Sequence, residues 1–151
     1  KPLKSVIESD TPVRNAAIYG IFGGHVNITD GNFVYMRAPN GDNRPLYNYT
    51  HMPSHMRSLF SIDEMSQMEK HKGFSFTKGC PVMQIPSAVA RREAFFDFNT
   101  MLYDIKKDPN QKIQLDDKAT EERLIKKMTE IMIESDAPPE QYKRLEIEKY
   151  M

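Results

Sequence analysis

Two short segments with a strand-like pattern flank a tight-turn sequence in the first quarter of the chain. In residues 26–29, Val26 and Ile28 alternate with polar neighbours, and residues 33–36 are β-favouring. Between them, residues 29–32 read Thr-Asp-Gly-Asn, and Asp-Gly tolerates the positive φ angles of tight hairpin turns. The pattern predicts an antiparallel hairpin. A fold that contains it must build an antiparallel sheet and cover its apolar face.

A helix that can provide this cover is predicted near the C-terminus. Its apolar stripe recurs at helical spacing and consists of Leu124, Ile125, Met128, Ile131 and Met132. Asp116 or Asp117 can cap its start, and the helix is expected to run to about Glu134. Pro138-Pro139 break it, and a last short helix is expected at residues 140–143.

The fold class predicted from these elements is α+β. Residues 100–103 add a further expected strand, and Asp108-Pro109-Asn110 turns the chain before the long helix. The expected architecture is a small antiparallel β-sheet covered by a C-terminal helix. All 151 residues are expected to form a single domain.

Residues 38–94 are expected to form an irregular insertion that carries a short helix. The stretch 39–53 is rich in Pro, Asn, Asp and Gly. Ser61 and Glu64 match a capping box, which predicts a helix near residues 62–71. Gly73 is a plausible stop for this helix.

Two extended segments are expected in the second half of the insertion. Residues 74–77 alternate Phe, Ser, Phe and Thr, which indicates a strand or an extended segment. Pro81 and Pro86 restrict residues 82–85 to an edge strand or a loop, because proline cannot donate to a sheet ladder.

Composition fits a soluble globular protein, with 39% hydrophobic and 28% charged residues. Lys plus Arg and Asp plus Glu both number 21, and the Arg91-Arg92 pair is a small basic cluster, so no nucleic-acid partner is expected. No apolar stretch approaches the length of a transmembrane helix, so no membrane partner is expected. The single Cys80 and the lack of a signal-peptide core near Lys1 favour the cytoplasm.

Two motifs carry a resemblance to a known family. Residues 102–111, Leu-Tyr-Asp-Ile-Lys-Lys-Asp-Pro-Asn-Gln, match the pattern LYD(I/L)-x-x-DP-x-(E/Q). Residues 29–37 are similar to a DG-x-(Y/F)-x-Y-x-R hairpin strand. Together they resemble the C-terminal subdomain of bacterial, arylsulfatase-like sulfatases of the alkaline-phosphatase superfamily. The resemblance covers residues 14–37 and about 95–147, and the insertion resembles the extended tails of some bacterial sulfatases.

The resemblance implies an accessory subdomain whose catalytic domain is absent from this chain. Sulfatases carry their nucleophile in a Cys/Ser-x-Pro-x-Arg motif, which does not occur here. After Cys80, Val82 and Gln84 stand where that motif needs Pro and Arg. The parent enzyme would hydrolyse a sulfate ester with a hydrated formylglycine and a divalent cation, calcium or magnesium. In this chain we expect no catalytic residue, no metal ligand and no activity alone, with the N-terminal catalytic domain as its partner.

Within the resemblance, five residues take structural roles. Leu102 and Tyr103 are expected to pack, while Asp104, Asp108 and Pro109 are expected to shape the turn that follows the strand.

Four further residues are candidates for the wall of a substrate cleft. His25 follows two glycines, which allow close backbone approach. His51 and His55 share the spacing of one helix face, but Pro53 between them disfavours a helix and no third metal ligand follows. Lys78, beside a glycine, could reach a sulfate or phosphate oxygen as a point charge. An ordinary structural or solvated role remains the competing interpretation for each.

Two alternative functions stay open at this point. One is an independent, non-catalytic binding or interaction domain. The other is the tail of a phosphatase or phosphonate monoester hydrolase of the same superfamily, whose distinguishing residues would lie outside this chain.

Overall fold

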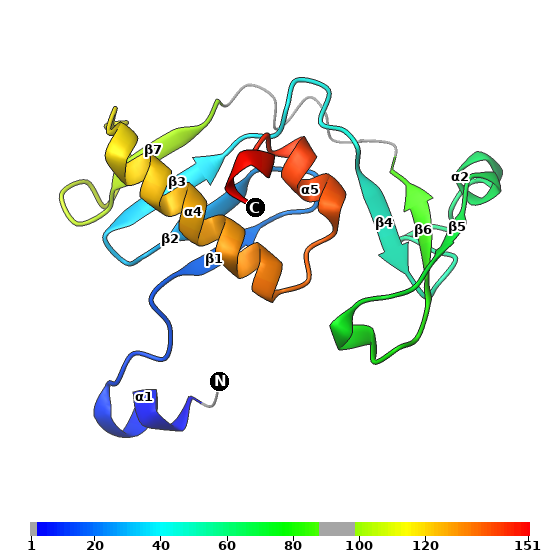
Figure 1. Cartoon of the computed structure of the whole chain (residues 1–151), viewed down its shortest axis with the longest axis horizontal. Coiled ribbons are helices and arrows are strands. Elements are labelled where there is room, and N and C mark those ends of the chain that lie inside the picture. Colours follow the sequence, from blue (N-terminus) through cyan, green and yellow to red (C-terminus); the bar gives the residue numbers. More distant parts are fainter. Residues whose placement is uncertain (1–2, 88–98) are drawn as a thin grey trace.

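The computed structural model of the chain describes residues 3–87 and 99–151 (Figure 1). Segment 88–98, with Arg91-Arg92, the end of the expected insertion and the start of the second matched stretch, lies outside the described residues. The described residues form two antiparallel sheets and a few helices. The α+β prediction is therefore confirmed.

The first sheet, sheet A, contains the predicted hairpin. Its four strands follow the order β1-β2-β3-β7, and all neighbours are antiparallel. They are β1 (Ala17–Gly20), β2 (Val26–Thr29), β3 (Phe33–Arg37) and β7 (Met101–Asp104). In the β2–β3 turn, Asp30 Oδ1 accepts hydrogen bonds from the amides of Asn32 and Phe33 at 2.9 and 2.8 Å, while Gly31 takes a φ of 85°.

Helix α4 (Lys118–Glu134) lies across one face of sheet A (Figure 1). Asp117 caps it, because its Oδ1 accepts from the Thr120 amide at 3.1 Å. Pro138 and Pro139 follow the end of α4. Helix α5 (Pro139–Arg144) begins with Pro139, and no amide donor is needed at the first position of a helix. Both C-terminal helices agree with the sequence prediction.

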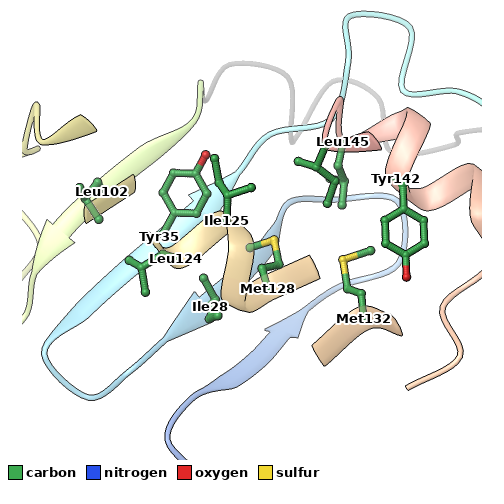
Figure 2. Packing of buried hydrophobic residues seen from close by; sticks show 10 residues of the cluster. Ile28, Tyr35, Leu102, Leu124, Ile125, Met128, Met132, Tyr142 and Leu145 are labelled. Carbon is green, nitrogen blue, oxygen red and sulfur yellow. The ribbon is translucent and has the colours of Figure 1, made fainter. Parts of the chain in front are cut away.

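The core lies between sheet A, α4 and α5 (Figure 2). It consists of Ile28, Tyr35, Leu102, Leu124, Ile125, Met128, Met132, Tyr142, Leu145 and Ile147. Because side chains alternate along a strand, the sheet residues of this cluster share the face that α4 covers. Burying each large apolar side chain stabilises the fold by roughly 1.5–3 kcal/mol.

A second sheet, sheet B, occupies the segment predicted as an irregular insertion. Its order is β4-β6-β5, with β4 (Tyr47–Thr50), β5 (Glu69–His71) and β6 (Val82–Pro86). The prediction of irregular chain at 39–53 is thus wrong over β4. Residues 82–85 form the central strand, not an edge strand, because both prolines stand at its ends and the amides between them stay free to pair.

Two other local predictions need correction in this segment. The capping box of Ser61 and Glu64 is present, but helix α2 (Ile62–Ser66) ends at Ser66. Strand β5 occupies the end of the range in which the helix was predicted. The segment 74–77 contains a 3₁₀ turn, η1 (Ser75–Thr77), instead of a strand. The Thr77 hydroxyl bonds back to the amide and carbonyl of Phe74 at 2.9 Å and so closes this turn.

Two short helical elements complete the described chain, namely α1 (Lys4–Ser9) and the 3₁₀ turn η2 (Glu148–Tyr150). Figure 1 shows α1 lying away from both sheets. Across residues 3–87 and 99–151, none of the helices has the length and apolar character needed to cross a lipid bilayer.

Candidate functional site

The face of sheet A opposite α4 carries an open apolar surface. One register row runs across all four strands, since Tyr19 pairs with Asn27, Asn27 with Met36, and Met36 with Met101. These residues line a shallow pocket of about 620 Å³ together with Tyr103. We call this row and its pocket the open face.

An unsatisfied polar atom lies in the open face. The side-chain oxygen of Asn27 is buried and has no hydrogen-bond partner among the described residues. A buried acceptor without a donor costs about 1–3 kcal/mol. A partner that covers the apolar side chains of the open face would remove them from water and so stabilise the complex.

A cleft separates the β1–β2 turn from sheet B and α5. Its volume is about 410 Å³, and most of its lining is apolar or aromatic. Its lining includes Ile21, Phe22, His25, Tyr47, Tyr49 and Arg144. We call it the junction cleft.

Arg144, at the end of α5, is the charged residue of the junction cleft and is 2% exposed. Its Nε donates to Gln141 Oε1 at 2.9 Å, and its Nη1 donates to Gly24 O at 3.1 Å and to Asn43 Oδ1 at 2.8 Å. Burial lowers the pKa of Arg144 to about 10, although the charge of Glu140 acts in the opposite direction. The guanidinium therefore stays charged at neutral pH.

Asn43 fixes this arginine from the loop that joins the two sheets. It is 1% exposed, and its Nδ2 donates to Gly23 O at 2.7 Å while its Oδ1 accepts from Arg144. A further bond of 2.6 Å joins the Asn40 amide to the Arg144 carbonyl. The β1–β2 turn, the connecting loop and α5 thus hold one another through a shared polar network.

Sheet B borders the junction cleft through Tyr49. Its hydroxyl donates to Glu140 Oε1 at 2.7 Å and accepts from Gln84 Nε2 at 3.2 Å. Burial, and then the hydrogen bond to the Glu140 carboxylate, raises the pKa of Tyr49 well above its usual value. The ring of Tyr49 packs edge-on against Phe74 and His71, with ring centroids at 4.9 and 5.1 Å.

The structure does not bring the four sequence-predicted cleft residues together. His25 lies at the β1–β2 turn and lines both the open face and the junction cleft. His51 and His55 lie beyond β4, where His55 Nε2 is 3.2 Å from Glu64 Oε1 and its ring packs on Phe60. Lys78 is exposed beside η1 in the left-handed conformation, with φ 53°.

In the matched Leu-Tyr-Asp segment, Leu102 lies in the core, and the Tyr103 hydroxyl is 3.3 Å from Met101 Sδ. Asp104 Oδ1 accepts from the amides of Lys106 and Lys107, each at 3.0 Å. These bonds, the Lys107 amide first, lower the pKa of Asp104.

Asp108 organises the loop that follows, ahead of Pro109. Its Oδ2 accepts from the amides of Lys112 and Ile113, the latter at 2.7 Å, and its own amide bonds to Asp104 O at 2.8 Å. Both carboxylates therefore bind backbone amides of this loop.

The described residues contain no group of three or more His, Cys, Asp and Glu side chains that could hold a metal ion. They do not fit the divalent cation that the family resemblance implies, and we assign no metal to them. Cys80, the position compared with the family nucleophile, is exposed, beside Pro81 at the start of β6.

Comparison of the chain with protein-family models gave no match, and comparison with curated proteins and with solved structures gave none either.

Sequence reasoning missed the most distinctive polar residues of the site. In the sequence, Arg144 is an ordinary basic residue in the last turn of a short helix, where the helix dipole stabilises a positive charge. Asn43 falls in a stretch of turn-forming residues. Their burial depends on contacts with Gly23 and Gly24, about 20 and 120 positions away in the sequence. Local sequence patterns carry no signal of such contacts.

Proposed function

We propose that this chain is the C-terminal accessory subdomain of a sulfatase-family hydrolase and that it has no hydrolytic activity of its own. In the full-length parent enzyme, it stabilises the catalytic domain and shapes the substrate cleft. The two sequence motifs motivate this proposal. The observation that carries it is a four-stranded antiparallel sheet that α4 covers on one face, while the opposite face presents an apolar row.

The docking partner we propose for the open face is the parent's own catalytic domain. An exposed apolar surface of this kind gains free energy when another protein surface covers it. Under this proposal, formylglycine and the divalent cation supply the hydrolytic chemistry within the catalytic domain, and residues of this chain take part in no bond cleavage.

The first test measures turnover. The isolated chain, incubated with 4-nitrophenyl sulfate and with calcium or magnesium, is expected to release no 4-nitrophenol above the uncatalysed rate. Release that saturates with substrate would refute the proposal. The polypeptide that precedes Lys1 in its gene is expected to contain a Cys/Ser-x-Pro-x-Arg motif, and a preceding domain without it would also count against the family assignment.

The second test addresses the docking face. In a polypeptide that includes the preceding domain, Met36→Lys places a charge in the open face and is expected to lower both the melting temperature and sulfatase activity. Met56→Lys is the matched control, because Met56 is fully exposed on the segment between β4 and α2. Equal effects of the two substitutions would show that the open face is not the docking surface.

A further inference from the structure

The geometry points to a second site in this chain: we propose that the junction cleft binds a small organic monoanion, whose oxyanion group meets Arg144 and whose apolar or aromatic body lies against the cleft walls. This site does not depend on the proposed function, since it is built from residues of this chain alone. It would operate equally in an independent binding domain.

The hydrogen bonds of Arg144 leave donors for a ligand. An arginine has five N–H donors, and the bonds to Gln141, Gly24 and Asn43 account for three of them. These bonds use Nε and Nη1. Within the part of the chain that the structure describes, Nη2 makes no hydrogen bond, and Arg144 is one of the residues that line the cleft.

Arg144 has no carboxylate within ion-pair distance among the described residues. Its three acceptors are neutral amide and carbonyl oxygens, and across residues 3–87 and 99–151 it forms no ion pair with a carboxylate. The neighbouring Glu140 carboxylate accepts from the Tyr49 hydroxyl. Because Glu140 acts on the buried charge of Arg144 without contacting it directly, an anion in contact with the guanidinium would stabilise that charge further. The negative charge of Glu140 also acts on this site and would repel a second negative charge on the ligand, which favours a monoanion over a dianion.

The walls define the remainder of the ligand. A volume of about 410 Å³ falls within the range of small-molecule sites, which are mostly apolar with a few polar groups that fix orientation. Ile21, Phe22, Tyr47 and Tyr49 supply the apolar contacts. The shared network of Asn43, Gly23 and Gly24 holds the guanidinium in place before any ligand arrives. Guanidinium donors suit both carboxylate and sulfonate oxygens.

The test titrates the isotopically labelled full chain with benzoate, benzenesulfonate and the neutral benzamide, followed by NMR. Benzoate or benzenesulfonate is expected to shift the amide signals of Gly24, Phe22 and Tyr49 in a saturable manner. Benzamide should bind at least about tenfold more weakly, because it lacks the charge that Nη2 would meet. The comparison of benzoate with benzenesulfonate identifies the preferred head group. Equal binding of benzamide and benzoate, or no saturable shift with either anion, would overturn the proposal.

Two variants locate the site. Arg144→Met is expected to abolish the preference for benzoate over benzamide, but it also removes donors from Gly24 and Asn43 and can unfold the chain. Phe22→Ala avoids this problem because Phe22 is 60% exposed, and it is expected to weaken benzoate binding about three- to tenfold. Phe76→Ala is the matched control, since Phe76 is 69% exposed and lies outside the cleft lining. Equal affinities of the two phenylalanine variants would place the anion elsewhere and refute the assignment.

Discussion

Gly73 is a single residue whose replacement tests the turn between β5 and β6. It adopts a φ of 89°, and a Cβ there would collide with the carbonyl oxygen of Cys80 and the hydroxyl of Thr77. Gly73→Ala is therefore expected to destabilise the chain by more than about 1 kcal/mol, measured by urea unfolding followed by tyrosine fluorescence. Gly41→Ala is the control, since a Cβ at Gly41 meets open space and needs no positive φ. A smaller effect at Gly73 than at Gly41 would contradict this turn geometry.

The carboxylate of Asp30 is expected to make the stability of the fold depend on pH. Burial alone would raise its pKa, but the amides of Phe33 and Asn32 and the Arg123 guanidinium, 2.8 Å away, together lower it below 3.8. A carboxylate with a lowered folded pKa stabilises the fold above its unfolded pKa, and this stabilisation is lost as pH falls through the folded value.

Asp30→Asn is therefore expected to cost about 1 kcal/mol at pH 7 and less at pH 2.5, because the wild-type fold loses this stabilisation as pH falls below the usual aspartate pKa towards the lowered folded value. Urea unfolding at both pH values measures the difference. Asp116→Asn serves as control, because the Asp116 side chain is 91% exposed. A cost at Asp30 that does not change with pH would show that the charge contributes nothing.

Local sequence chemistry predicts those single residues whose partners are close in sequence. The Asp30-Gly31 turn, the Ser61–Glu64 capping box and the Asp117 cap all bond within four positions, and each was readable from residue type and spacing. The burial of Arg144 was not predictable from its neighbours in the sequence, because it arises from contacts with residues about 100 positions away. The site thus depends on long-range packing that no local pattern encodes.

Among the helices and strands, α4 offers the sharpest test of the core. Leu124 on its inner face is fully buried, whereas Ile133 on its outer face is 52% exposed. Leu124→Ala is expected to destabilise the chain by about 2–5 kcal/mol, because it leaves a cavity under the helix. Ile133→Ala should change stability by less than about 0.5 kcal/mol. Urea unfolding of both variants measures this, and similar costs would mean that α4 does not cover sheet A through the Leu124 face.

The two sheets differ in how far their strands were predictable. The β2–β3 hairpin and α4 have strong periodic patterns and were placed correctly, because each pattern arises from the one face that the element buries. In sheet B, β5 is a three-residue strand with two exposed residues, and β6 lies between two prolines. Such strands are stabilised by their pairing with distant segments, so the capping box and the two prolines predicted a longer helix and an edge strand or loop in their place.

At the scale of the whole molecule, hydrogen bonds connect the segment that carries sheet B with the region of α4 and α5. The Ser75 amide donates to Asp136 Oδ2 at 2.7 Å, the Asn40 amide to Arg144 O, and the Tyr49 hydroxyl to Glu140. Each bond links the insertion to the α4–α5 region that covers sheet A. The segment that carries sheet B is therefore attached to the α4–α5 region at several points.

A double-mutant cycle on Tyr49 and Glu140 tests this coupling. Tyr49→Phe and Glu140→Gln each weaken the 2.7 Å bond between sheet B and α5, so the double variant should lose less stability than the sum of the single variants. We expect a coupling energy of about 0.5–3 kcal/mol from urea unfolding. The exposed pair Glu122 and Lys126 on α4, 3.0 Å apart, is the control cycle and should give no more than about 0.5 kcal/mol. Additivity at Tyr49 and Glu140 to within about 0.3 kcal/mol would show that the sheets unfold independently.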